Sequence, residues 1–342
     1  EVGVEPAEED VFEAVLGWLD GSLLITGHAG TGKSHLTRRI LAELDSRGLT
    51  HVETAPTHAG AIQVGGITLH RFSHSKFSGK KIPRVEQDYL VVSEVGFCSV
   101  VLVSLLAEIR LANPSLCFIL EGDFRQLPCP QNLWHGTEIT QDMMDEGALF
   151  WELAGGRRVH LTQCRRSDPR LFELYTMPRP IEELKALLPF KGMAPWSLCV
   201  SHRCRKRLNE RKNRQCRELD HISLEADKRF PQSQKVYLAE GVPLVACKTW
   251  EGEGITNASF WTVVGLNPLR LESEAGKVTE FDPARFQEYF RLAHAMTYQV
   301  AQGRTLPGTV CLWEVGSCYF SAKQLRVGLS RATAVELVSI AP

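Results

Sequence analysis

The residues whose types and spacing most directly indicate chemistry form the octet GHAGTGKS at positions 27–34. It matches the pattern G-x-x-x-x-G-K-[ST], in which glycines let backbone N–H groups turn toward phosphate oxygens. In this pattern the lysine reaches the β and γ phosphates and the final hydroxyl is a ligand for Mg²⁺. The octet therefore predicts a nucleoside triphosphate site made of Gly27, Ala29, Gly30, Thr31, Gly32, Lys33 and Ser34.

Acidic and amide side chains follow two further apolar runs. After YLVV at 89–92 come Ser93 and Glu94, and Glu94 can orient and deprotonate the attacking water. The position before this glutamate normally carries an aspartate that supports Mg²⁺, so Ser93 is a weak candidate metal ligand. After the run at 116–121 come Asp123 and Gln126, which predict either a γ-phosphate sensor or a simple turn.

Such side chains need a parallel sheet that gathers the carboxyl ends of its strands at one edge. Short apolar runs alternate with helical patterns, which indicates an α/β fold with helices on both faces of parallel sheets. We expect a first domain at 1–152 and a second at 153–342, with the run at 158–162 as the first strand of the second. Short β-like runs at about 225–290 predict a small β-barrel inserted into the second domain.

The composition is that of a folded protein with 44% hydrophobic and 23% charged residues. The net charge of −1 neither supports nor excludes a nucleic-acid partner. No apolar run approaches the roughly 18 residues that a membrane span requires. We therefore expect no membrane partner and an intracellular location, with the nucleus or a viral replication site as options.

Five further segments, in this order, make the chain resemble superfamily 1B DNA helicases of the PIF and RecD type. They are APTHAGA at 55–61, TLHRF at 68–72, LTQCRRSD at 161–168, AHAMTYQVAQGRTL at 293–306 and LRVGLSRA at 325–332. The resemblance implies two recA-like domains, the second carrying an SH3-like β insertion at about 225–290. It also implies ATP and Mg²⁺ as cofactors, single-stranded or forked DNA as partner, movement from 5′ to 3′, and a function that a monomer can perform.

The resemblance assigns roles to individual residues. The catalytic set it implies is Lys33, Glu94, Gln126, Arg166 (or Arg165, because the spacing slips by one) and Arg331, the last as an arginine finger. It implies nucleotide contact for Gly303 and DNA contact for Thr57, His70, Phe72 and Thr305. By position, residues 73–88 resemble a much shortened form of the wedge that splits duplex DNA. We expect Arg166 and Arg331 to reach across from the second domain.

Two departures from the family leave alternatives open. The upstream adenine-reading glutamine is absent, with Asp10 near its place, and Gln299–Gly303 lacks two groups of the usual HKSQG segment. Ser93 leaves open a weakly hydrolysing P-loop protein that binds nucleic acid. A superfamily 1 RNA helicase, which shares the P-loop but not the APTHAGA and TLHRF segments, is a further alternative.

Basic and cysteine-rich residues lie further along the chain. The run at 201–217 is either a phosphate-contacting surface or a solvated helix face. The cysteines and histidines at 199–221 have spacings that match no usual zinc motif.

Overall fold

The computed structural model describes residues 8–76, 84–177 and 179–342. The chain divides into two compact units, Glu1–Arg166 and Ser167–Pro342. Among the described residues, no helix combines the length and the apolar character needed to cross a membrane.

The first unit is built on a six-stranded parallel sheet with the strand order β3-β2-β4-β5-β1-β8. Its strands are β1 (Leu23–Gly27), β2 (His51–Ala55), β3 (Ile67–Thr68), β4 (Tyr89–Val92), β5 (Cys117–Gly122) and β8 (Arg158–Leu161). Every residue of β1 and β4 is buried. This burial is expected for a parallel sheet covered on both faces.

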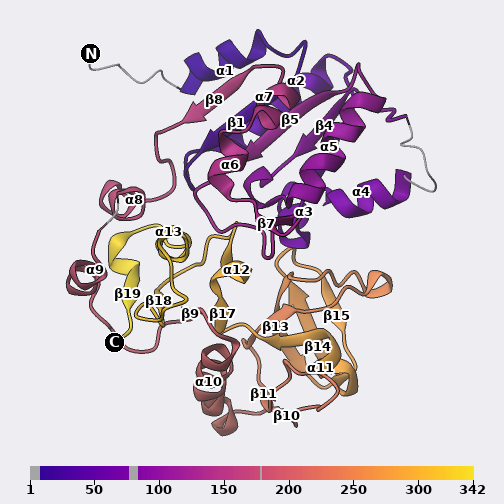
Figure 1. The fold of residues 1–342 in the computed structure, drawn as a ribbon. Coiled ribbons are helices and arrows are strands. Elements are labelled where there is room, and N and C mark those ends of the chain that lie inside the picture. Colours follow the sequence, from indigo (N-terminus) through magenta and orange to yellow (C-terminus); the bar gives the residue numbers. More distant parts are fainter. Residues whose placement is uncertain (1–7, 77–83, 178) are drawn as a thin grey trace. The chain divides into compact units, whose positions relative to one another are not determined.

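Helices cover both faces of this sheet (Figure 1). They are α1 (Glu8–Leu16), α2 (Lys33–Ser46), α3 (His58–Val64), α4 (Leu69–Lys76), α5 (Val100–Ala112), α6 (Gln141–Asp145) and α7 (Ala148–Leu153). Val91 and Ile119 pack in the core beneath α1 and α2, whereas Val92 and Leu120 pack against α5 and α7. Successive side chains of a strand point to opposite faces, which explains this division. The remaining short elements are η1 (Val95–Phe97) and the hairpin β6 (Leu133–Trp134) and β7 (Thr137–Glu138).

The strand at 158–161 corrects the expected start of the second domain. The sequence pattern predicted this strand as the first of the second domain, but β8 pairs in parallel with β1 of the first unit, with Ile25 opposite Val159. The chain then continues from β8 to Arg166, where the first unit ends. An edge strand can join a sheet through main-chain hydrogen bonds alone, so its apolar pattern does not reveal which sheet it joins.

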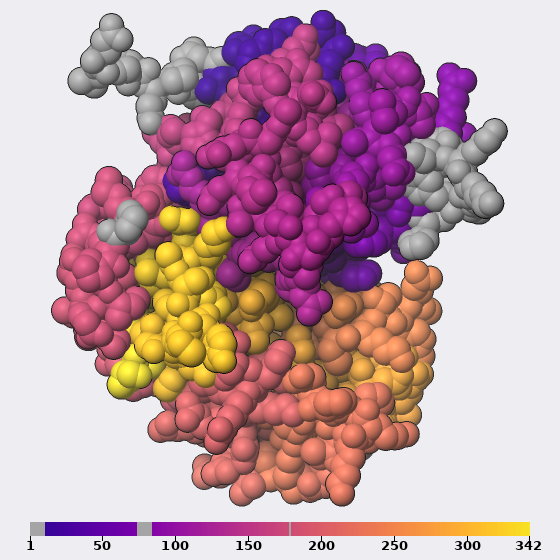
Figure 2. All heavy atoms as spheres, in the orientation of Figure 1, coloured from indigo at the N-terminus to yellow at the C-terminus, as the bar shows by residue number. Residues whose placement is uncertain are grey.

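The second unit contains a four-stranded parallel sheet with the order β17-β9-β18-β19. The strands are β9 (Trp196–Cys199), β17 (Ala295–Thr297), β18 (Val310–Leu312) and β19 (Val338–Ile340). The helices of this unit are α8 (Pro169–Thr176), α9 (Ile181–Leu187), α10 (His202–Asn213), α12 (Tyr298–Ala301) and α13 (Ala322–Leu329). α13 packs on α8, and in Figure 2 the yellow C-terminal segment adjoins the pink segment that contains α8 and α9.

Between β9 and β17 the chain forms a β-rich insertion. Its main part is a five-stranded antiparallel sheet with the order β15-β14-β13-β12-β16. The elements are β10 (Ile222–Leu224), β11 (Val236–Leu238), β12 (Pro243–Ala246), β13 (Phe260–Leu266), β14 (Leu269–Ser273), β15 (Val278–Glu280), α11 (Phe286–Tyr289) and β16 (Phe290–Leu292). The small β insertion expected at about 225–290 thus has a counterpart, and its likeness to an SH3 module stays a prediction.

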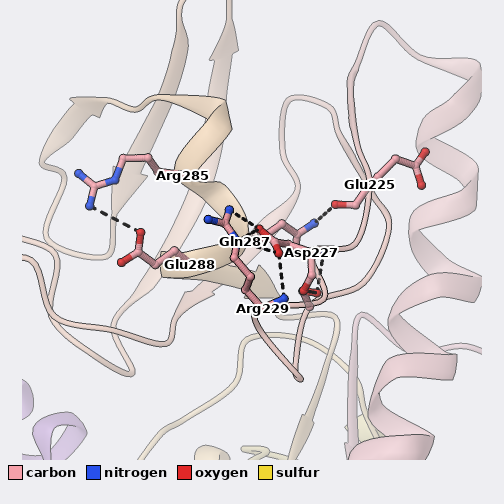
Figure 3. Close-up of polar contacts among 7 residues, drawn as sticks. Glu225, Asp227, Arg229, Arg285, Gln287 and Glu288 are labelled. Carbon is pink, nitrogen blue, oxygen red and sulfur yellow. Dashed lines mark hydrogen bonds and ion pairs between the residues drawn. The ribbon is translucent and has the colours of Figure 1, made fainter.

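A loop at 225–234 is fastened to the insertion by polar contacts (Figure 3). The Gln287 side-chain amide donates to the carbonyl oxygens of Glu225 and Gln234, at 2.9 and 2.8 Å. Asp227 and Arg229 form an ion pair within the loop, at 2.7 Å. The two Gln287 bonds thus connect the loop to α11.

One buried amide joins α10 to the rest of the second unit. Asn209 is fully buried, donates to the carbonyl oxygens of Leu292 and Ala295, and accepts from the Ala295 N–H. Because each of these backbone groups is buried, the three hydrogen bonds fix where the insertion rejoins the parallel sheet. Asn209 therefore has a structural role in this unit.

Candidate nucleotide-binding site and nucleic-acid contacts

The glycine-rich loop runs from the end of β1 to the first turn of α2. Gly27, Gly30 and Gly32 have φ of +154°, +81° and +91°, and a Cβ at Gly27 would lie 2.5 Å from the Leu161 carbonyl oxygen. The Lys33 ammonium donates to the carbonyl oxygens of Gly27 and His28, at 3.0 Å each. A loop with its N–H groups at a helix N-terminus and a lysine folded over it is arranged to receive phosphate oxygens.

The segment after β8 lies against this loop. The Arg165 N–H donates to the Gly30 carbonyl oxygen at 2.7 Å, and a Cβ at Gly30 would meet the Arg166 Cβ at 3.1 Å. The expectation that Arg166 belongs to the second domain is therefore wrong, because it adjoins the phosphate loop of its own unit. The pairing of β8 with β1 carries both arginines to this place.

The segment after β4 holds Glu94 in a left-handed backbone conformation, with φ of +57°. Such a conformation costs a non-glycine residue about 1–3 kcal/mol, and it is found preferentially at functional sites. The adjacent Ser93 is 3% exposed, and its hydroxyl has no hydrogen-bond partner among the described residues. The predicted base therefore directly follows a buried hydroxyl that makes no hydrogen bond to the described residues.

A buried carboxylate next to the loop was not singled out from the sequence. Glu121, 5% exposed near the end of β5, accepts from the Ser34 hydroxyl at 2.7 Å and from the Thr37 hydroxyl at 3.0 Å. A glutamate that closes an otherwise apolar strand is the signal that could have revealed it, because buried carboxylates are rare unless they are paired.

The loop after β5 places two predicted residues in the interior. Asp123 and Gln126 are 7% and 5% exposed, and the Gln126 amide donates to the Asp123 carboxylate at 3.1 Å. The Gln126 carbonyl oxygen has no partner among the described residues. Arg125 lies 2.6 Å from His28 of the phosphate loop, counted between Nη1 and Nε2. The loop after β5 is thus joined directly to the phosphate loop.

The three predicted DNA contacts of the first unit differ in exposure. Thr57 caps α3 by accepting from the Gly60 N–H at 3.0 Å, and His70 is exposed on α4. Phe72 is 2% exposed within the core formed with Leu69 and Leu90. The prediction that Phe72 contacts DNA is therefore wrong, because a ring buried among apolar side chains cannot stack on a base. Of the expected wedge at 73–88, residues 77–83 lie outside the described residues, and the wedge stays a prediction.

In the second unit, Thr305 is exposed and lines a cleft of about 230 Å³. The Trp196 and Phe260 rings stack in this cleft at 5.9 Å between centroids, and the Arg304 guanidinium lies 3.9 Å from the Phe260 centroid. Arg304 also pairs with Glu274 at 3.1 Å. Sequence reasoning missed this aromatic and cationic cluster because its members come from separate strands.

Arg331 is buried inside the second unit, with 1% of its surface exposed. Its guanidinium donates to the carbonyl oxygens of Val327, Ala301 and Arg304, at 2.9, 3.1 and 2.7 Å, and to the Ser330 hydroxyl at 2.7 Å. Gly303, with φ of +78°, lies between Ala301 and Arg304, whose carbonyl oxygens accept two of these bonds. The predicted arginine finger thus holds its own unit together in this conformation.

The basic run at 201–217 is only partly a free surface. Arg205 is 2% exposed and donates to Gln232, and the Lys212 ammonium donates to the Ala194 carbonyl oxygen at 2.9 Å. The exposed basic members of the run are Arg203, Arg207, Arg211, Arg214 and Arg217. These contacts favour a structural part for the buried members.

Two of the cysteines beside this run come together. The thiols of Cys199 and Cys204 lie with the Glu314 carboxylate within 4.8 Å of one another. That carboxylate already accepts from the Val200 and Ser201 N–H groups and from the Ser201 hydroxyl. Glu314 therefore closes the turn from β9 into α10.

The comparisons with known proteins point to one family. Residues 5–102 match the family of PIF1-like helicases. The ATP-dependent DNA helicase PIF7 of Trypanosoma brucei brucei is 32% identical over 198 residues, which cover 49% of this chain and 19% of that protein. Human ATP-dependent DNA helicase PIF1 is 25% identical over 381 residues, which cover 92% of this chain and 57% of that protein. The chain thus spans about a fifth and just over half of these two relatives.

A solved structure has the same fold. The Pif1 helicase from Bacteroides, crystallised in complex with ADP-AlF3 and ssDNA, superposes with a TM-score of 0.69 and 18% sequence identity. The superposition covers 99% of this chain and 93% of that one. The two parallel sheets described above are therefore two RecA-like domains. The family match over residues 5–102 and the curated relatives thus make this chain similar in sequence to PIF1-like helicases, and the solved structure makes it similar in fold.

Proposed function

We propose that this chain is the ATP-hydrolysing motor of a DNA helicase that moves along single-stranded DNA from 5′ to 3′. The observation that carries the proposal is the meeting of the phosphate loop, Glu94 and Gln126 at the carboxyl ends of β1, β4 and β5. Open parallel sheets bind their ligands at this edge. Two further observations support a DNA helicase activity. The curated relatives are DNA helicases by name, and the Bacteroides Pif1 helicase was crystallised with a nucleotide analogue and ssDNA.

The chemistry follows from the positions of these side chains. The loop N–H groups and Lys33, released from the Gly27 and His28 carbonyl oxygens, would bind the phosphates. Glu94 would accept a proton from the attacking water. Gln126, whose carbonyl oxygen is buried without a partner, would sense the γ-phosphate. Arg166 or Arg165, beside Gly30, would compensate negative charge that develops on the phosphates.

The residues around Ser34 fit Mg²⁺. Hydroxyl and carboxylate oxygens are its preferred ligands, and the Ser34 hydroxyl and the Glu121 carboxylate are adjacent here. Ser34 would hold the ion, with Ser93 as a weaker neighbour. When bound, Mg²⁺ would neutralise phosphate charge during transfer.

The nucleic-acid contacts proposed for the first unit are Thr57 and His70. For the second unit we propose the exposed Thr305 and the half-buried Trp196 ring in its cleft as contacts for a single strand, with the buried Phe260 and Arg304 supporting that ring from behind. Phosphate contacts make affinity fall with rising salt, so a salt titration of DNA binding measures this part of the proposal.

The deciding experiment measures ATP hydrolysis with no nucleic acid, with single-stranded DNA and with single-stranded RNA. We expect DNA to stimulate hydrolysis and Lys33→Ala to abolish the stimulated rate. Binding of DNA without stimulation would favour the weakly hydrolysing protein, and stimulation by RNA alone would favour an RNA helicase. Unwinding of a forked duplex with a 5′ tail, and not with a 3′ tail, tests the polarity.

A further inference from the structure

The first unit lacks a carboxylate where the metal site of such a motor needs one, and it has an unassigned carboxylate on the next strand. In P-loop enzymes the ion is held by the serine or threonine of the loop and by an aspartate that ends a neighbouring strand. Position 93, at the end of β4, carries a serine. Its hydroxyl is buried and has no partner among the described residues.

Glu121 occupies the matching place on β5. Val92 of β4 pairs with Leu120 of β5, so Ser93 and Glu121 are the next residues along two adjacent parallel strands. The Ser93 N–H continues the hydrogen bonding between β4 and β2 by donating to the Thr54 carbonyl oxygen at 2.9 Å. Val91 and Ile119, two residues earlier, both point into the core beneath α2. By strand alternation, positions 93 and 121 face the same side of the sheet at the same level.

The contacts of Glu121 are directed at the phosphate loop. One carboxylate oxygen accepts from the Ser34 hydroxyl at 2.7 Å and the other from the Thr37 hydroxyl at 3.0 Å, one helical turn further along α2. With 5% exposure, the carboxylate is withdrawn from solvent and aimed by two bonds. A group that hydrogen-bonds a metal ligand fixes the orientation and the basicity of that ligand.

We propose that Glu121 supplies, from the neighbouring strand, the metal-site carboxylate that position 93 lacks. It orients the Ser34 hydroxyl toward the ion and accepts a hydrogen bond from metal-bound water, since Mg²⁺ retains several waters in nucleotide sites. Of the other carboxylates near this edge, Glu94 is the proposed base, and Asp123 accepts from the Arg125 N–H and the Gln126 amide of its own loop. The inference rests on the proposed nucleotide site but not on movement along DNA.

The test is the dependence of nucleotide affinity on metal. A fluorescent ADP analogue is titrated into each variant with saturating Mg²⁺ and with a chelator, and Mn²⁺ binding is followed by paramagnetic resonance. We expect Glu121→Gln to lower the Mg²⁺ enhancement of affinity by about 10- to 100-fold, as loss of an outer-shell group does. Affinity without metal should change by less than about twofold, because Lys33 and the loop are untouched. Glu108→Gln, an exposed change on α5, is the matched control.

Two further variants separate charge from packing. Glu121→Asp keeps the charge on a shorter side chain, so it should retain more of the Mg²⁺ enhancement than Glu121→Gln, and the reverse order would overturn the proposal. Ser93→Asp should restore the enhancement in the Glu121→Gln background. In the wild-type background, Ser93→Asp should not raise the Mg²⁺ enhancement of affinity, because two adjacent carboxylates repel each other. Thermal unfolding of each variant shows that the comparison is made between folded proteins.

Two further results overturn the inference. One is a folded Glu121→Gln protein that keeps the full Mg²⁺ enhancement, and the other is a wild-type chain whose nucleotide affinity does not depend on Mg²⁺. Failure of the motor function has a different signature. If DNA does not stimulate hydrolysis but Glu121→Gln still loses the enhancement, the DNA motor is excluded and the metal-site assignment is retained.

Discussion

Replacing Arg331 distinguishes an arginine that acts on nucleotide from one that holds its own unit together. Arg331→Ala removes the donors for three buried carbonyl oxygens and one hydroxyl. Each buried acceptor that loses its donor costs about 1–3 kcal/mol. The Val327 oxygen also accepts from the Ser330 hydroxyl and the Ala301 oxygen from the Arg304 N–H, so only part of this cost applies. With the cavity left by a large buried side chain, which costs about 2–5 kcal/mol, we expect a total loss of about 3–5 kcal/mol.

Two other substitutions set the scale. Arg331→Lys keeps the charge but lacks the planar fork that reaches several acceptors, so we expect a loss of about 2 kcal/mol. Arg326→Ala, on the helix α13 that precedes Arg331, removes a donor to the Tyr175 carbonyl oxygen, and we expect a loss of about 1 kcal/mol. Denaturant unfolding measures all three. Hydrogen exchange at the Leu306 amide, which donates to the Arg331 carbonyl oxygen at 2.9 Å, locates the effect.

Activity measurements complete the test. An arginine that acted only on the nucleotide would, when replaced, lower kcat by about 10³-fold or more and leave the unfolding free energy unchanged. An Arg331→Ala protein within about 0.5 kcal/mol of the wild type, the usual scatter of surface changes, would refute the structural reasoning. If Arg331→Ala lowers stability strongly but the folded protein that remains keeps its DNA-stimulated ATP hydrolysis, Arg331 does not act as an arginine finger.

Three other perturbations have defined outcomes. Phe72→Ala should lower the unfolding free energy by about 3–5 kcal/mol, as for a buried aromatic ring, without a selective loss of DNA affinity in the folded protein; a selective loss would restore the DNA contact. Glu94→Gln should lower ATP hydrolysis by about 10²- to 10⁴-fold while nucleotide affinity is kept, and equal losses in both would remove Glu94 as the base. Burial lowers the pKa of His294 to about 4, so the unfolded chain binds a proton there between pH 6.5 and about 4 and the folded chain does not. Stability is therefore lost as pH falls through this window, by up to about 3 kcal/mol, and His294→Gln should flatten this slope in pH-dependent unfolding; an unchanged slope would contradict the burial effect.

The residues that act through their neighbours in sequence could be predicted without the fold. The phosphate loop depends on glycines, a lysine and a serine within eight positions, between a strand and a helix that the same local pattern specifies. Positive φ at Gly30 and Gly32, and the start of α2 at Lys33, agree with that prediction. The order of the later segments was enough to indicate a two-domain helicase fold, because each has a short, local signature.

Other properties depend on which distant segments meet. Glu121 and Ser34 are 87 positions apart, and only the placement of β5 beside β1 brings the carboxylate to the loop. The same kind of long-range pairing assigns β8 and Arg166 to the first unit and buries Phe72 in its core. Residue type and spacing thus determined the nucleotide chemistry of this chain, since that chemistry is built from consecutive backbone groups. Tertiary packing alone decided the carboxylate partner, the domain boundary and the exposure of each side chain, since these depend on free energies summed over contacts far apart in sequence.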